Sequence, residues 1–169
     1  MRYIFTIIGS VVVTVTLVAF FFNLNQINEE RATLTINLEQ RASLLADSLK
    51  ESVEPSYISS TSLSASLQKI VNRFANRERL AGIALYDNKG TLLATSSGLP
   101  KTIIENIKSV SDVMDSNKSK SNFFDADGET RYVFVDPLHN EEGSILGALM
   151  IVQNAGYINE TIGQIWKDN

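Results

Sequence analysis

The sequence predicts an α+β protein in which a long N-terminal helix leads into an antiparallel sheet with flanking helices. Three observations support this prediction. Residues 3–22 form an uncharged apolar stretch, and residues 23–54 contain neither glycine nor proline. After residue 80 the apolar spacing changes from the helical three and four to the short runs and alternation of strands. Antiparallel hairpins with helices gathered on one side define the α+β class.

Residues 3–22 have the length and composition of a transmembrane helix. At about 1.5 Å per residue, such a helix covers roughly 30 Å, the thickness of a bilayer's hydrocarbon core. A cleaved signal peptide is disfavoured because the stretch ends in Ala-Phe-Phe-Phe, without the small residues of a cleavage site. A buried core helix is disfavoured because the stretch is apolar all round. Since Arg2 is the only charged side chain before it, we expect a cytoplasmic N-terminus, an anchor over residues 1–22 and residues 23–169 outside the cytoplasm.

Residues 23–55 are expected to continue out of the membrane as a stalk helix that Pro55 ends. Two interpretations of its apolar positions stay open and are compatible. The stripe packs on the chain's own domain, or it also pairs with a second copy to form a homodimer. The apolar positions of one heptad seam are Leu24, Ile27, Leu34, Leu38 and Leu45, and Arg31, Arg41 and Ser48 occupy the remaining seam positions.

Residues 56–155 are expected to form one α+β domain. A serine-rich loop precedes a helix over residues 63–76. Apolar runs at 80–86 and 91–96 flank Asp87-Asn88-Lys89-Gly90 and predict a β-hairpin. The spacing of apolar residues then predicts a helix over 103–114.

The second half of this domain is expected to add two or three strands. The polar, lysine-rich residues 117–122 predict a loop. The nearly continuous apolar run 144–152 predicts a central strand buried on both faces, and residues 156–169 predict an amphipathic exit helix. The other expected elements are a short strand at 123–124, a turn at 125–128, an alternating strand at 130–136 that Pro137 stops, and a turn at 139–143.

Composition limits the partners and the chemistry. The chain carries 15 Lys and Arg against 19 Asp and Glu, for a net charge of −4, which argues against a nucleic-acid partner. There is no cysteine, and His139 is the only histidine, so a zinc site would need carboxylates almost alone. No Gly-x-Ser-x-Gly elbow or phosphate-binding glycine loop occurs. Asp125-Ala-Asp-Gly128 lacks the EF-hand spacing and is better explained as a hairpin turn. We therefore expect no catalytic residue, metal or cofactor in this chain.

Two segments resemble a known family. The stretch Ile83-Ala-Leu-Tyr-Asp-Asn-Lys-Gly-Thr-Leu-Leu-Ala-Thr-Ser96 resembles the strand, Asp-x-x-Gly turn, strand signature of Cache and PAS-like extracytoplasmic sensor domains. Glu142-Gly-Ser-Ile-Leu-Gly-Ala-Leu-Met-Ile-Val152 is similar to that family's last core strand. Residues 152–158 also resemble sensor-like regions that precede HAMP in some bacterial membrane-linked trehalose-phosphate synthases.

The resemblance implies a single Cache sensor between two membrane helices, followed by HAMP and an effector such as a histidine kinase, cyclase or chemotaxis domain. This sequence departs from that plan because it stops at Asn169, after Trp166 and Lys167, where the second membrane helix would begin. We expect it to be either the front part of a longer signalling protein, with any catalytic effector beyond Asn169, or a stand-alone anchored sensor or accessory subunit.

The resemblance also places a ligand site on the sheet face covered by the middle helix and loops. Arg131, Tyr132 and His139 are the candidates. A strand-borne guanidinium can bind a carboxylate with two hydrogen bonds, but Arg131 and Tyr132 point to opposite faces, so at most one of them lines the pocket. Structural roles for both residues are the alternative. His139 is expected in a polar turn, either solvated or with a pH-sensing or ligand-contacting role.

We therefore expect a membrane-anchored, periplasmic sensor region of the bacterial inner membrane, which binds a small molecule and relays the signal through its terminal helices. The alternatives are a ligand-free structural or dimerisation module, or the N-terminal regulatory part of a membrane-linked enzyme.

Overall fold

The computed structural model describes the backbone of residues 2–59, 63–75, 80–105 and 107–158, and their side chains except at 2–11, 19–31 and 56–59. The chain divides into two compact units. One comprises residues 1–36 together with 158–169, and the other comprises residues 37–157.

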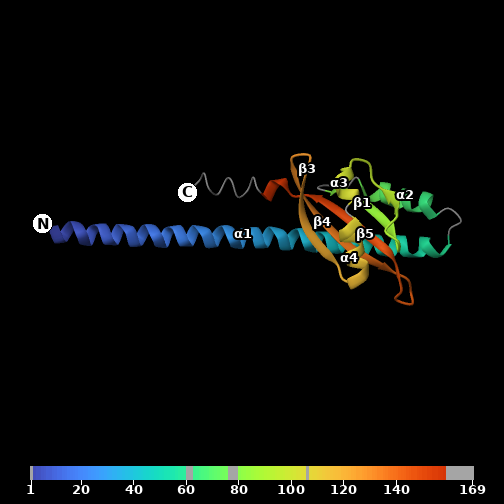
Figure 1. The fold of residues 1–169 in the computed structure, drawn as a ribbon, viewed down its shortest axis with the longest axis horizontal. Coiled ribbons are helices and arrows are strands. Elements are labelled where there is room, and N and C mark those ends of the chain that lie inside the picture. Colours follow the sequence, from blue (N-terminus) through green and yellow to red (C-terminus); the bar gives the residue numbers. More distant parts are fainter. Residues whose placement is uncertain (1, 60–62, 76–79, 106, 159–169) are drawn as a thin grey trace. The chain divides into compact units, whose positions relative to one another are not determined.

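Helix α1 runs from Arg2 to Ser59 (Figure 1), so the predicted end at Pro55 is wrong. A proline removes one helical hydrogen bond, and at Pro55 this loss is confined to the last turns. No helix with described side chains has both the length and the apolar character needed to cross a membrane. Within the predicted span at residues 3–22 the backbone is helical, and side chains are described only at 12–18.

In the second unit, α1 buries one stripe of side chains against the sheet. The stripe consists of Leu38, Ala42, Ala46, Leu49 and Val53, each no more than 1% exposed. It confirms the interpretation that the stalk packs on its own domain. The buried stripe departs from the predicted heptad seam beyond Leu38, because a straight helix drifts about 20° per heptad away from a 3.5-residue repeat. Arg41 and Ser48 accordingly face solvent. Pairing of the seam with a second copy stays a prediction.

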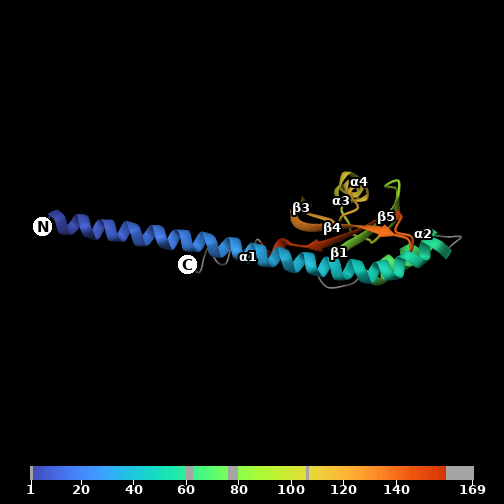
Figure 2. The same ribbon diagram turned by 90° about the horizontal axis from the view of Figure 1, so that it is seen from below.

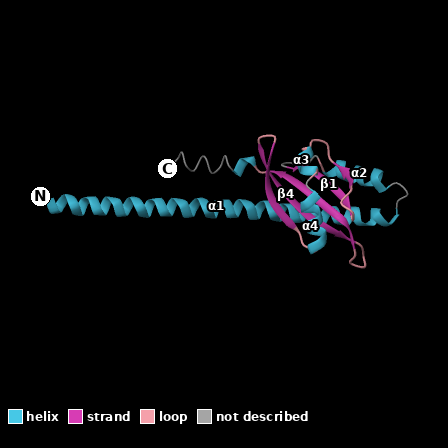
Figure 3. Ribbon diagram, in the orientation of Figure 1, coloured by secondary structure: helices cyan, strands magenta, loops and turns pink. Residues whose placement is uncertain are grey.

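Five antiparallel strands form one sheet in the order β2-β1-β5-β4-β3, which confirms the α+β class and the predicted central strand β5. Figure 3 shows the strands in magenta. Their bounds are β1 Leu80–Asp87, β2 Leu92–Thr95, β3 Lys120–Ala126, β4 Glu129–His139 and β5 Ile145–Asn154. Hairpins join β1 to β2, β3 to β4 and β4 to β5, and a longer connection over residues 96–119 joins β2 to β3.

Helices cover both faces of this sheet (Figure 2). Residues 37–59 of α1 and helix α2 (Leu63–Phe74) lie on one face. The short helix α3 (Lys101–Ile104) and helix α4 (Ile107–Ser116) lie on the other, where Val110 and Val113 pack with Val133, Val135 and Met150. The expected gathering of helices on one side is therefore wrong, because both faces of the strands carry apolar side chains that need cover.

Three other local predictions are corrected. Lys120, Ser121 and Asn122 were expected in a loop but open β3, where they pair with β4; exposed polar residues suit an edge strand. β4 continues through Pro137, because β3 begins at Lys120 opposite Val135 and leaves that side of β4 unpaired beyond Val135, a position where proline is tolerated. The single helix expected over 103–114 is divided into α3 and α4.

The tight turn between β3 and β4 agrees with its predicted hairpin chemistry. Asp127 and Gly128 both adopt positive φ, 54° and 77°, as a two-residue type I′ turn requires. Of the predicted exit helix at 156–169, residues 156–158 are helical, and residues 159–169 lie outside the described part.

Candidate functional site

A cavity of about 160 Å³ lies between α4 and the strands β3 and β4, on the sheet face that α3 and α4 cover. This is the face on which a ligand site was expected. The cavity is lined by Ser109, Asp112, Lys120, Ser121, Asn122, Phe124, Val133 and Val135.

The cavity combines one charge of each sign with an apolar wall. Asp112 on α4 and Lys120 on β3 form an ion pair, with 3.3 Å between Oδ2 and Nζ, and both side chains are nearly half exposed. Val133 and Val135 on β4 are buried members of the core beneath α4, and Phe124 packs against that core. Because side chains alternate along a strand, Lys120, Asn122 and Phe124 share one face of β3. The arrangement can bind a small molecule that carries both charges and an apolar part.

Arg131 lies on the same sheet face but does not line the cavity. Its guanidinium donates to Asn154 Oδ1 and forms an ion pair with Glu129, with 2.6 Å between Nη2 and Oε2. Among the described residues, its buried Nε has no hydrogen-bond partner. The side chain is thus held by neighbouring strand residues, and the predicted ligand role stays a prediction.

Tyr132 points to the opposite face, as expected, and is 1% exposed. Its ring meets Phe123 edge-on, with 5.1 Å between the ring centroids. Burial is the main influence on the pKa of Tyr132 and raises it. The nearby Ser121 side chain lowers this pKa, and the charge of Glu39 on α1 raises it. Tyr132 therefore belongs to the packing between α1 and the sheet.

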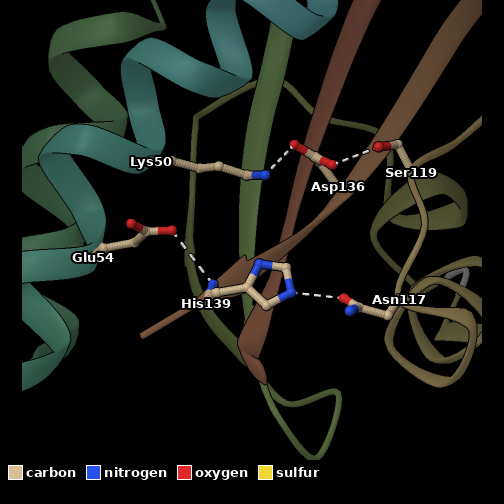
Figure 4. Close-up of polar contacts among 6 residues, drawn as sticks. All are labelled: Lys50, Glu54, Asn117, Ser119, Asp136 and His139. Carbon is tan, nitrogen blue, oxygen red and sulfur yellow. Dashed lines mark hydrogen bonds and ion pairs between the residues drawn. The ribbon is translucent and has the colours of Figure 1, made fainter. Parts of the chain in front are cut away.

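His139 is the last residue of β4 rather than part of a turn. Its Nε2 lies 2.6 Å from Oδ1 of Asn117, and its backbone N–H donates to Glu54 Oε1 on α1 over 3.4 Å (Figure 4). The three predicted residues are therefore not brought together, and none of them lines the cavity.

A second polar group joins α1 to β4 beside His139. Lys50 Nζ lies 2.6 Å from Asp136 Oδ2, and the Ser119 hydroxyl donates to Asp136 Oδ1 over 2.7 Å (Figure 4). The side chains of Lys50 and Asp136 are only 21% and 9% exposed. A carboxylate buried this far is stable only when paired, so this group fixes the position of α1 on β4.

A wider groove of about 500 Å³ lies between α2 and the edge strand β2. Gln68 on α2 bonds the backbone of Thr95 there, donating to its carbonyl over 2.8 Å and accepting from its N–H over 3.3 Å. The described residues that line the groove are all uncharged: Gln68, Asn72, Ala75, Thr95, Ser96 and Ser97. Since the described lining of the smaller cavity includes charged groups that can orient a ligand, that cavity is the better candidate.

Metal binding finds no support in the part of the chain that the structure describes. No group of three or more His, Asp or Glu side chains there is arranged to hold a metal ion.

Sequence reasoning missed Asp112, Lys120 and Asp136. The ion pair across the cavity could not be foreseen, because it depends on β3 beginning at Lys120, where a loop was expected. Asp136 carried a usable signal, since it follows Tyr132 and Phe134 on the apolar face of an alternating strand. A charge at such a position predicts a buried partner.

The sequence matches the family model described as the WalK sensor protein kinase Cache domain over residues 66–153, which is more than half of the chain. No curated protein matches the sequence.

Solved structures with a similar fold include ligand-binding domains of chemoreceptors. The domain of the amino acid chemoreceptor PctC of Pseudomonas aeruginosa PAO1, in complex with GABA, is 12% identical with a TM-score of 0.60, over 86% of this chain and 67% of that one. The domain of the Campylobacter jejuni chemoreceptor Tlp3 with L-valine is 12% identical with a TM-score of 0.59, over 83% and 62%. The domain of Mlp24 with asparagine is 12% identical with a TM-score of 0.59, over 84% of this chain and 58% of that one. The chain thus spans about three fifths of the length of the Tlp3 and Mlp24 domains.

Proposed function

This chain belongs to the family of the WalK sensor protein kinase Cache domain, and from that premise we propose that it senses a small molecule in the cavity between α4 and the strands β3 and β4. The observation that carries the proposal is the position of this cavity, which pairs opposite charges with an apolar wall on one face of a Cache sheet. Catalytic output, in this proposal, belongs to an effector domain such as a histidine kinase.

The proposed ligand is a small zwitterion of amino-acid size. At about 160 Å³ the cavity is smaller than the roughly 300–1,000 Å³ typical of ligand pockets, which favours a compact molecule. A ligand carboxylate would take the place of Asp112 at Lys120, and a ligand ammonium would take the place of Lys120 at Asp112. Amino acids are also the ligands named for the PctC, Tlp3 and Mlp24 domains, which supports this class as the first to test.

Thermal unfolding of the full 169-residue chain against a panel of amino acids tests the proposal. A ligand that binds only the folded state raises the melting temperature in proportion to its occupancy. We expect a rise with one or more amino acids, and we expect Lys120→Met to abolish it. A flat response to the whole panel would overturn amino-acid sensing.

Lys118→Met is the matched control. Lys118 is an exposed lysine two residues before Lys120, and it does not line the cavity. We expect this variant to keep the full ligand response. A loss of the response in both variants would show that general charge, rather than the cavity, is responsible.

Membrane anchoring and an extracytoplasmic position are further parts of this proposal. Residues 3–22 carry no charge, and family membership supports a position outside the cytoplasm. Between residues 12 and 18 the large apolar side chains are all more than half exposed: Val12, Val13, Val15, Leu17 and Val18. At about 100° per residue they cover all sides of the helix, and a helix that is apolar all round needs a non-aqueous environment.

A homodimer through α1 is the second candidate role, and the exposure of Leu44 favours it. This leucine is 71% exposed on the side of α1 that faces away from the sheet. Sedimentation of the full chain in detergent, compared with Leu44→Lys, tests the role. We expect a dimer that the substitution dissociates, and a monomer at all concentrations would overturn it.

A further inference from the structure

We propose that the connector between α4 and β3, residues 117–119, transmits occupancy of the cavity to helix α1. The inference rests on the proposed sensing function, and it names the residues through which the site would act. It concerns only the compact unit of residues 37–157, in which every contact used below lies.

The connector joins two walls of the cavity. α4 ends at Ser116 and β3 begins at Lys120, so only three residues separate them. Asp112 lies one helical turn before the connector, and Lys120 follows it directly, and these two side chains form the ion pair at the cavity. A molecule that separates Asp112 from Lys120 would therefore pull on both ends of the connector.

The connector also touches the network that holds α1. The Ser119 hydroxyl bonds Asp136, which forms the ion pair with Lys50. The Asn117 side chain bonds His139, whose backbone N–H donates to Glu54. Figure 4 shows these two series of polar contacts side by side, each leading from the connector through β4 to α1.

The sheet otherwise separates the cavity from α1. The cavity opens on the face under α4, whereas Lys50 and Glu54 approach β4 from the α1 face. The connector contributes to both sides because β3–β4 pairing begins at Lys120 and Val135, which leaves Ser119 free to reach Asp136. Asn117 in the connector adopts a left-handed φ of 49°, which asparagine tolerates better than most residues.

The coupling can be measured without a natural ligand. The chain contains no cysteine, so Ser109→Cys places a single thiol in the wall of the cavity. Propyl methanethiosulfonate then attaches a propylthio group there as a disulfide and serves as an artificial occupant. Amide hydrogen exchange of residues 46–54 reports on α1 on the far face of the sheet.

We expect modification of the full-length Ser109→Cys variant to speed exchange in residues 46–54 by about fivefold or more, the lower end of typical allosteric couplings. The same modification in a chain that also carries Asn117→Gly and Ser119→Ala should leave those amides unchanged. Glycine keeps the left-handed backbone at position 117, and Ser119 is exposed, so these substitutions remove the two contacts and leave Lys50–Asp136 in place.

Lys108→Cys, modified in the same way, is the control. Lys108 is exposed, adjacent to Ser109 and outside the cavity lining, so we expect no response in α1. The inference is overturned if modification at position 109 leaves α1 unchanged, or if it changes α1 equally with and without the connector contacts. Because no amino acid is used, this result is independent of whether the proposed ligand class is correct.

Discussion

Asp136 is one of the residues that hold α1 on the sheet, in addition to the apolar stripe of that helix. Its carboxylate is almost fully buried and has two partners, Lys50 at 2.6 Å and Ser119 at 2.7 Å. A buried charge that loses its partner retains the cost of its desolvation, whereas removal of both charges can be nearly neutral. The pair therefore serves better to fix the position of α1 than to add net stability.

Lys50→Met tests this at the level of one ion pair. We expect the variant to lower the free energy of unfolding by about 2–4 kcal/mol, near the lower end of values for broken buried pairs, because Lys50 keeps some contact with water. Combining it with Asp136→Leu should restore most of the loss. Urea unfolding measures both variants, and Lys69→Met on the exposed side of α2 is a control expected to change little. A double variant no more stable than Lys50→Met would contradict the argument.

Tyr86 makes stability depend on pH in the alkaline range. It is 1% exposed, its hydroxyl donates to the Ile104 carbonyl over 2.7 Å, and burial raises its pKa from 10.0 to about 12. Below pH 10 both the folded and the unfolded chain keep the proton. Between about pH 10 and pH 12 only the unfolded chain loses it, so stability falls with rising pH, by a total of about 2–3 kcal/mol.

Urea unfolding at a series of pH values from 8 to 11 measures this slope. Tyr86→Phe should lose about 1 kcal/mol at neutral pH with its hydrogen bond, and it should show a shallower decline above pH 10. Some decline should remain, because burial also raises the pKa of Tyr132. An unchanged alkaline slope in Tyr86→Phe would show that other groups cause it.

At the scale of single elements, strand and helix patterns predicted most of the fold. Alternation and apolar runs located β1, β2, β4 and β5, because each buries at least one face in a way that depends mainly on its own side chains. The predictions were wrong where the structure of a segment depends on the strand beside it. Lys120–Asn122 becomes a strand only because β4 offers a partner, and Pro137 is accepted only because the pairing of β4 with β3 does not extend past Val135.

The candidate site was less predictable than the fold for the same reason. Arg131, Tyr132 and His139 were chosen for their chemistry along one strand, whereas the cavity is assembled from a helix and two strands. The opposite orientation of Arg131 and Tyr132 followed from strand alternation and was correct. The pairing of Asp112 with Lys120 requires the position of α4 over the sheet, which no local pattern contains.

Strand β5 has a close backbone contact that only glycine permits. A Cβ atom at Gly147 would lie 2.0 Å from the Tyr86 carbonyl oxygen on β1. Because the obstacle is backbone in the centre of the sheet, Gly147→Ala should destabilise the protein by about 2–4 kcal/mol, at or above the usual cost of overpacking. Thermal unfolding measures it. Gly156→Ala, where a Cβ meets nothing within 4 Å, should be neutral or slightly stabilising.

At the scale of the compact unit, the end of the last strand is tied to the helix that enters the domain. Gln153 on β5 is buried, and its Nε2 donates to the Leu38 carbonyl of α1 over 3.1 Å. Ala155 then donates from its backbone to Thr130 on β4. A shift of α1 relative to β4 at Lys50 and Asp136 would therefore also displace the end of β5, where the chain leaves the sheet.

The molecule as a whole is expected to be held at a membrane by the N-terminal part of α1. Val13→Arg with Leu17→Arg places two charges one turn apart on the exposed apolar segment, at a cost of about 2.5–3.5 kcal/mol each in the centre of a membrane helix. We expect the unsubstituted chain to stay in the membrane pellet after an alkaline carbonate wash and the double variant to be released. Leu44→Arg, which adds a charge to an exposed leucine beyond residue 22, should stay in the pellet. Release of the unsubstituted chain, or retention of the double variant, would contradict membrane anchoring, while the cavity and its connector could still be tested independently.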